Sequence, residues 1–131
     1  MTKIFFDQSV ESFIQALEKP TIAKVLHVID LLEKFGHQLG LPHSKKIGAG
    51  LFELRIQGRQ EIRIFYTFQK GNIVMLYGFI KKSQLIPRRE IKQAKRKLKG
   101  LDPPTLLTLF KATVGETRHC YSLFELISPN V

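Results

Sequence analysis

Three apolar runs between Leu51 and Lys82 constrain the fold of this sequence more than any other feature. The runs read L-F-E-L-R-I-Q, E-I-R-I-F-Y-T-F-Q and N-I-V-M-L-Y-G-F-I-K-K, and each has the length of a strand. A break at Gly58-Arg59-Gln60 separates the first two, and a Lys70-Gly71 turn separates the last two. Apolar runs joined by short turns predict a three-stranded antiparallel meander.

The alternation of side chains along these runs divides the predicted meander into two faces, because successive residues of a strand point to opposite sides. One face is apolar and is predicted to be the core side: Phe52, Leu54, Ile56, Ile62, Ile64, Tyr66 and Phe68. The other face carries Glu53, Arg55 and Arg63, with Lys81 and Lys82 at its far end. We expect the second face to be a polar surface that suits a polyanion.

The segments before the meander predict a strand and two helices. Lys3–Phe6 has the pattern of a short strand, and Asp7 or Ser9 can cap the helix that follows. Pro20 suits the first turn of a second helix, which Gly36 ends. Apolar residues recur at helical spacing along both helices, so the pair is expected to form a hairpin that covers the apolar face of the meander.

Two further segments surround the meander. His37 to Gly50 is predicted to be a loop, and its Lys45 and Lys46 have two interpretations: ordinary loop chemistry, or phosphate contacts at the rim of a site. Pro87 is expected to open a helix that Gly100 closes. Seven residues of that helix are basic: Arg88, Arg89, Lys92, Lys95, Arg96, Lys97 and Lys99. Its narrow apolar stripe predicts weak docking on the core, and its exposed surface can contact RNA or receive an acidic partner.

The net charge of +10 is concentrated in one part of the chain. Residues 51–100 hold 13 Lys and Arg against 3 Asp and Glu, whereas residues 1–50 hold 6 against 5 and residues 101–131 hold 2 against 3. Such concentration favours a nucleic-acid or other polyanionic partner, and a basic face made only for solubility is the competing interpretation.

Cysteine, histidine and hydropathy patterns indicate the compartment. A single cysteine, Cys120, allows no intrachain disulfide, and the four scattered histidines lack zinc-ligand spacing. We therefore expect no metal or other cofactor. The amino terminus has too short an apolar stretch for a signal peptide, and no run reaches membrane-spanning length, so the prediction is a cytoplasmic protein.

Five segments, in this order, resemble the RelE/ParE superfamily of type II toxins, and most closely its HigB-like, phage-derived branch. They are residues 31–36, the run from Lys45-Lys46-Ile47-Gly48 into residues 50–55, residues 63–66, residues 78–82, and Pro87-Arg88-Arg89-Glu90-Ile91 with Ala94. The resemblance implies an α+β, RelE-like fold, with a strand and helical hairpin on an antiparallel sheet and a basic helix after it. It covers residues 1–100 as one toxin domain and leaves residues 101–131 as an extension of unknown role.

By this resemblance the chain looks like a ribosome-dependent endonuclease that cuts mRNA without a metal. Its partners would be the ribosome, mRNA and a helix-turn-helix, HigA-like antitoxin. The chemistry needs a proton acceptor for the attacking 2′-hydroxyl, cations for the phosphate and a proton donor for the leaving oxygen. Arg63 matches the arginine of the family's R-x-F/V-Y pattern and would stabilise the phosphate, and Lys81 and Lys82 match its F-x-K-K signature. RNA contacts are expected from Lys45, Lys46, Lys81, Arg88 and Arg89.

The acid and base of this reaction stay open. Glu53 is either the base or an ion-pair partner that orients Arg55 or Arg63. Tyr77 stands where HigB-like members carry a histidine. A tyrosine can donate a proton or stack on a base, but it is a poor base near neutral pH. Two other functions remain: a ParE-like inhibitor that binds DNA gyrase, and an RNA-binding or interaction module without activity.

Overall fold

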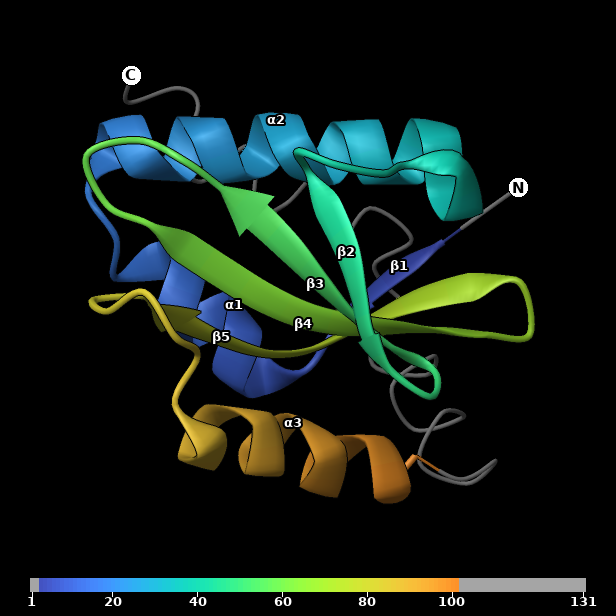
Figure 1. Ribbon diagram of the computed structural model, residues 1–131. Helices are drawn as coiled ribbons and strands as arrows, with labels where there is room; N and C mark the ends of the chain where they lie inside the picture. The colour runs from blue at the N-terminus through green and yellow to red at the C-terminus, as the bar shows by residue number, and fades with distance from the viewer. Residues whose placement is uncertain (1–2, 102–131) are drawn as a thin grey trace.

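The computed structural model describes residues 3–101, which form a five-stranded sheet with helices on both faces (Figure 1). The order across the sheet is β1-β5-β4-β3-β2. The strands are β1 (Ile4–Phe6), β2 (Ser44–Gly48), β3 (Leu51–Ile56), β4 (Ile62–Gln69) and β5 (Asn72–Ile80). The helices are α1 (Gln8–Gln15), α2 (Lys19–Phe35), the 3-10 turn η1 (Gly36–Gln38) and α3 (Arg88–Lys99). The predicted α+β class is confirmed.

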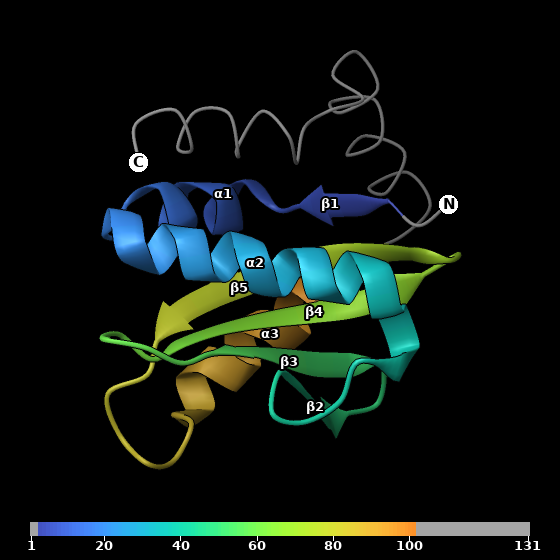
Figure 2. The same cartoon turned by 90° about the horizontal axis from the view of Figure 1, so that it is seen from above.

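The meander of β3, β4 and β5 is present as predicted, with antiparallel pairing throughout. Lys70 and Gly71 form its second turn with φ values of 52° and 79°, the left-handed conformation that a two-residue hairpin favours. β1 pairs parallel to β5, with Phe5 opposite Val74. The parallel pairing places the start of the chain at one edge of the sheet, where α1 begins (Figure 2).

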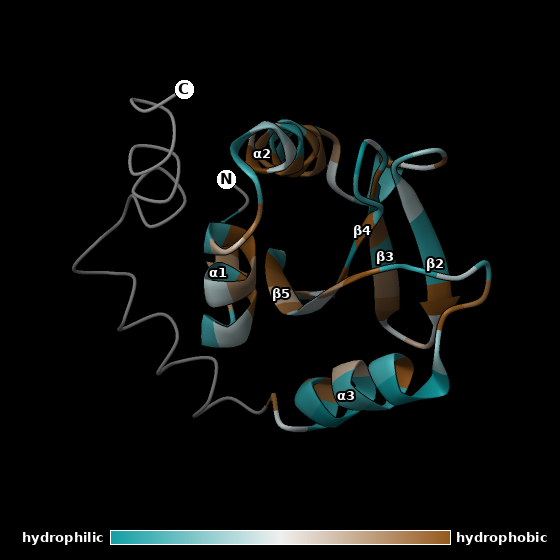
Figure 3. Ribbon diagram, turned by 90° about the vertical axis from the view of Figure 1, so that its left-hand side faces the viewer, coloured by the Kyte–Doolittle hydropathy of each residue, from teal (hydrophilic) through white to brown (hydrophobic). Residues whose placement is uncertain are grey.

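The apolar face of the meander is covered by α1 and α2, as the helical spacing predicts (Figure 3). Ile14 of α1 and Leu32 of α2 are fully buried against this face. Tyr66 is 1% exposed on the same side, which confirms that it is a core residue. Gly78 allows the close approach of α1, because a β carbon there would lie 2.6 Å from the ring of Phe13.

The opposite face holds a second core, which corrects the expectation of a polar surface across this face. α3 packs there against β4 and β5 through Ala94, which is fully buried, and through the half-buried Ile91 and Leu98. The sheet contributes Phe5, Leu51, Phe65, Val74, Leu76 and Phe79. A bulge between Met75 and Tyr77 explains the presence of Leu76, since the extra residue shifts the alternation of β5. α3 therefore packs through the narrow apolar stripe that its sequence shows, and most of its basic residues remain exposed.

The loop expected from His37 to Gly50 contains a strand, β2, which is the edge of the sheet. The segment S-K-K-I-G has no alternation of apolar and polar residues, so its sequence gives no strand signal. Pairing with β3 holds it in place, together with a hydrogen bond between the hydroxyls of Ser44 and Tyr66. Lys45 and Lys46 consequently lie on a strand and point to opposite faces of the sheet.

An ion pair fastens α3 to the start of α1. Lys97 Nζ lies 2.7 Å from Asp7 Oδ2 and 2.7 Å from Ser9 Oγ, and Asp7 is also the N-cap residue of α1. Burial alone would raise the pKa of Asp7, but hydrogen bonds from Lys97 and Ser9 and the charge of Lys97 outweigh it. The pKa of Asp7 consequently lies below its ordinary value of 3.8.

Because the pKa of Asp7 is lowered, its carboxylate is expected to contribute to the free energy of unfolding, and this contribution is lost in acid. A carboxyl group with a depressed folded-state pKa stabilises the protein above its unfolded pKa of about 3.9, and this contribution disappears as the pH falls through the folded value. The Asp7→Asn variant keeps a good N-cap but lacks the charge. In urea denaturation, the wild type is expected to exceed the variant in stability by a constant margin above about pH 5, and the margin should shrink at lower pH. A margin that does not change with pH would contradict this role.

Of the predicted extension at residues 101–131, only Leu101 belongs to the described residues, and it packs against the second core. Cys120 lies outside the described residues. Within residues 3–101, no helix is long and apolar enough to cross a membrane.

Candidate active site

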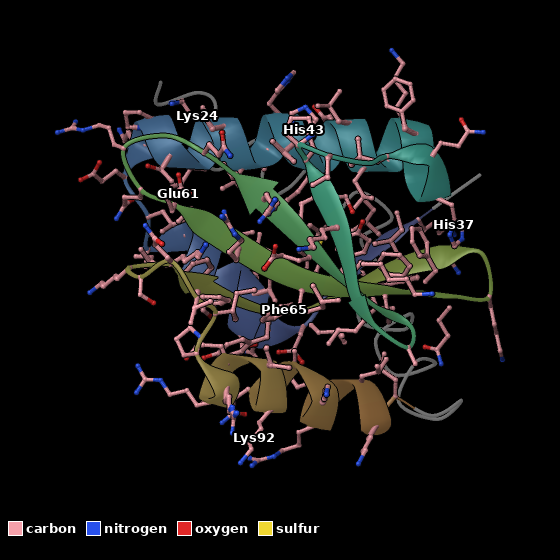
Figure 4. All side chains as sticks on the ribbon, in the orientation of Figure 1. Lys24, His37, His43, Glu61, Phe65 and Lys92 are labelled. Atoms are coloured by element: carbon pink, nitrogen blue, oxygen red, sulfur yellow. The ribbon has the colours of Figure 1, made fainter. Side chains whose placement is uncertain are left out.

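Strand register places the predicted site residues in two rows across the face that α3 partly covers. The first row runs from Lys45 on β2 through Glu53 and Phe65 to Tyr77 on β5. The second row runs from Arg55 on β3 through Arg63 on β4 to Phe79 on β5. Directly opposed side chains lie about 4.5–5.5 Å apart at their β carbons, so each row is a continuous line of contacts. Figure 4 shows Phe65 near the centre of this face, above α3.

Glu53 is a buried carboxylate held by two arginines. It is fully buried, its Oε1 accepts a hydrogen bond of 3.0 Å from Arg55 Nε, and Arg63 Nε lies 3.8 Å from the same oxygen. The other oxygen, Oε2, is buried and has no hydrogen-bond partner. A buried carboxylate oxygen without a hydrogen-bond partner is costly, and because Oε2 is buried, a ligand reaches it only when the side chains around it move.

Arg63 is itself buried, with 4% of its side chain exposed, which corrects the expectation that it projects from an open surface. Its Nη1 donates to Glu61 Oε2 at 3.1 Å and to the carbonyl oxygen of Ile62 at 3.2 Å. Its Nε is buried without a hydrogen-bond partner. The guanidinium thus lies between Glu53 and Glu61, and it holds both carboxylates on this face.

Arg55 and Lys45 are the more accessible cations beside Glu53. The side chain of Arg55 is 25% exposed, and Lys45, directly opposite Glu53, is exposed at the sheet edge. Lys46 pairs with Phe52 and lies on the other face, so the structure separates the two lysines that the sequence groups together. We refer to Glu53, Arg55, Glu61 and Arg63 as the charged cluster.

The remaining predicted residues lie around a groove between α1, β5 and α3, with a volume of about 590 Å³. We call it the β5–α3 groove; its lining includes Tyr77, Phe79, Lys82, Arg89 and Glu90, together with Phe13 and Pro87. Lys82 and Arg89 are exposed there. Lys81 joins the groove to the charged cluster, because its backbone N–H donates to the carbonyl oxygen of Glu61 at 2.7 Å. Arg88 is exposed in the first turn of α3 but does not line the groove.

The hydroxyl of Tyr77 interacts with Glu90. Burial raises the pKa of Tyr77, and so do the hydrogen bond with Glu90 and the negative charge of Glu90, whereas Arg89 acts in the opposite direction. Tyr77 therefore stays protonated at neutral pH. This environment suits a proton donor or a stacking surface, and it excludes Tyr77 as a base near pH 7.

A second cavity, of about 380 Å³, lies beside α2 and the end of β3 and is lined by Lys24, His27, His43 and Arg55 among others. Lys24 and His43 are labelled in Figure 4. His27 is exposed at this cavity. Among residues 3–101, no group of three or more His, Cys, Asp or Glu side chains is arranged to hold a metal ion.

A family model described as "Phage derived protein Gp49-like (DUF891)" matches residues 12–99. The chain belongs to this Gp49-like family. Two solved structures are also similar, both of the YoeB-YefM complex from Staphylococcus aureus, one of them described as a heterotetrameric toxin-antitoxin complex. In each, the matched chain is 19% identical, with a TM-score of 0.46, and the match covers 63% of this chain and 98% of the other. No curated protein sequence matches the chain.

The family match in this Gp49-like protein spans the charged cluster and the whole β5–α3 groove, because both lie within residues 12–99. Sequence reasoning missed two members of these sites, Glu61 and Glu90. Glu61 lies directly before β4 and precedes Arg63 by two residues, so alternation predicts that it falls on the same face as Arg63. Glu90 is the single acidic residue of α3, and its burial among basic neighbours is visible only in the folded chain.

Proposed function

We propose that this Gp49-like protein is the toxin of a type II toxin–antitoxin system, of the HigB-like branch, and that it cleaves mRNA on the ribosome. The observation that carries the proposal is the charged cluster. In it, two arginines orient a buried carboxylate whose second oxygen is unpartnered. Exposed cations surround the cluster, as binding to an RNA backbone requires.

The proposed reaction is attack of a ribose 2′-oxygen on the adjacent phosphorus without a metal ion. The new bond joins the 2′-oxygen to phosphorus, and the bond from phosphorus to the 5′-oxygen breaks, leaving a 2′,3′-cyclic phosphate and a 5′-hydroxyl. Once the side chains of the charged cluster rearrange to admit the RNA, Glu53 Oε2 accepts the proton of the 2′-hydroxyl. Arg55, Arg63 and Lys82 then stabilise the charge that develops on the phosphate. Tyr77, with its raised pKa, supplies the proton to the leaving oxygen.

One observation favours a second candidate, a module that binds RNA or protein without cleaving. Arg63 already donates to Glu61 and to a backbone carbonyl, and it is 4% exposed. A guanidinium in that state reaches a phosphate only if the side chains of the charged cluster rearrange. A protein that binds through its surface cations alone, including a ParE-like inhibitor of gyrase, needs no such rearrangement.

The proposed partners are the ribosome, mRNA and a helix-turn-helix antitoxin of the HigA type. The outward face of α3 supports such contacts, because Arg88, Lys92, Lys95, Arg96 and Lys99 are all exposed along it. Figure 4 shows Lys92 pointing away from the sheet. An unbroken row of cations on one helix suits either rRNA phosphates or the acidic side chains of an antitoxin.

The test is to add the purified protein to translating ribosomes and to map the ends of the mRNA. We expect cuts that require the ribosome, that leave a 5′-hydroxyl, and that persist with a chelator at a concentration that ribosomes tolerate. Co-expression with the protein encoded by the adjacent reading frame should restore growth. Intact mRNA together with arrested growth would reject cleavage and support the binding module, and gyrase assays would then identify a ParE-like inhibitor.

A further inference from the structure

The β5–α3 groove holds Tyr77 and Lys82, which the proposed cleavage uses, but also Phe79, Arg89 and Glu90, which it does not require. It combines aromatic rings, two exposed cations and a buried carboxylate in one open volume of about 590 Å³, within the size range of small-molecule sites. Tyr77 and Phe79 are stacked with ring centroids 6.5 Å apart and an interplanar angle of 25°. Tyr77 is half-buried, so part of its surface remains open to the groove.

Glu90 is the unusual member of this groove. It occupies the third position of α3, where a glutamate ordinarily reaches back to the backbone N–H of the N-cap residue. The N-cap residue is Pro87, which has no N–H, so that interaction is impossible. The Glu90 carboxylate instead faces Tyr77 and lies 3.3 Å from Arg89 Nε. A carboxylate has about four acceptor positions, and these two partners leave capacity for two more donors.

The chemistry of such a site selects a particular nucleobase. RNA-binding sites hold unstacked bases between aromatic side chains and read their Watson–Crick edges through hydrogen bonds. A carboxylate accepts hydrogen bonds only, and guanine is the RNA base whose Watson–Crick edge presents two adjacent donors, N1–H and the N2 amino group. Adenine, cytosine and uracil each present one donor beside an acceptor, which would face a carboxylate oxygen unfavourably.

We infer that the β5–α3 groove binds a guanine nucleotide, with the base against Tyr77 and its donor edge on Glu90. Lys82 and Arg89, which line the same groove, contact the phosphate. Phe79 pairs directly with Arg63 across β4 and β5, so the groove adjoins the charged cluster. The inference rests on the proposed RNA-cleaving function for the nature of its ligand, and it assigns to the groove the choice of the base next to the cleaved phosphate.

Binding of free nucleotides tests the groove without requiring cleavage. The probes are the 5′-monophosphates of guanosine, adenosine, cytidine and uridine, titrated into the isotope-labelled full chain and followed by NMR. We expect guanosine monophosphate to bind about tenfold more tightly than the other three nucleotides. This ratio is in the lower part of the range of discrimination that a bidentate contact to a base provides. Its chemical-shift changes should centre on the backbone amides of Tyr77, Gly78 and Phe79. Equal affinity for the four nucleotides, absence of binding, or shift changes elsewhere would overturn the inference.

The Glu90→Gln variant supplies the decisive comparison, because an amide presents one donor and one acceptor and so matches adenine rather than guanine. The variant is expected to lose the preference for guanosine monophosphate, whereas Glu33→Gln, on the exposed surface of α2, should keep it. Should Glu90→Gln fail to fold, Arg89→Gln on the exposed rim is expected to lower the affinity for all four nucleotides by the same factor.

The positions of the mapped mRNA cuts distinguish the groove assignment from the proposed function. Cleavage without a guanine preference overturns the groove assignment alone. Selective guanine binding without cleavage overturns the proposed function alone.

Discussion

Replacing Arg63 with alanine is expected to lower the rate of mRNA cleavage by about 10²–10³, the usual cost of losing one preorganised charge that stabilises a transition state. In the structure the Arg63 guanidinium lies between Glu53 and Glu61. In the proposed mechanism the substitution removes a cation from the phosphate, and in the structure it leaves Glu53 with Arg55 as its remaining ion-pair partner among the described residues. Cleavage is measured as the initial rate of cutting at a mapped site in a defined mRNA.

The burial of Arg63 requires a check that the variant folds, since removing one partner of a buried ion pair can cost about 3–5 kcal/mol. Arg63→Lys retains the charge but not the bidentate geometry of the guanidinium, and it should recover only part of the rate. Arg59→Ala, in the exposed β3–β4 turn, is the matched control and should leave the rate unchanged. Full activity in a folded Arg63→Ala variant would remove Arg63 from the mechanism.

The meander was predictable because its alternation is regular and its turns carry Gly58 and Lys70-Gly71. β2 was not, because S-K-K-I-G has one large apolar residue and becomes a strand only through pairing with β3. Local sequence carries no information about such pairing, since the stabilising partner is another segment of the chain. The assignment of Lys45 and Lys46 to one loop failed for the same reason.

The burial of the charged cluster was also beyond sequence reasoning. Alternation placed Glu53, Arg55 and Arg63 on one face correctly, but it predicted a polar surface there. The bulge that brings Leu76 to this face, and the docking of α3 through Ala94, convert part of that surface into a core. Neither event leaves a periodic signal, because a bulge is one inserted residue and α3 has only a narrow apolar stripe. Because it is buried, the Glu53 carboxylate is fixed by Arg55 and Arg63 and does not move as a surface side chain would.

The two oxygens of Glu53 have different environments, which gives a sharp prediction for Glu53→Gln. The glutamine oxygen can still accept from Arg55 Nε, as Oε1 does at 3.0 Å, but the amide cannot take up a proton as the unpartnered Oε2 can. We expect the cleavage rate to fall by about 10²–10⁴, the range for loss of a general base. The pH–rate profile provides the second measurement, because a base that becomes protonated in acid produces a fall in rate on that side.

The acid side of that profile distinguishes the two interpretations of Glu53. If Glu53 is the base, the residual activity of Glu53→Gln should lose the fall in rate at low pH, whereas Glu61→Gln should keep it. Glu61 is the matched control because it also binds Arg63, at 3.1 Å, and its side chain is 43% exposed. A folded Glu53→Gln variant that is slow but keeps the acid side of the profile would show that Glu53 only orients the arginines. The base would then be a different group, and because Tyr77 is protonated near pH 7, it would come from the RNA, the ribosome or another part of this chain.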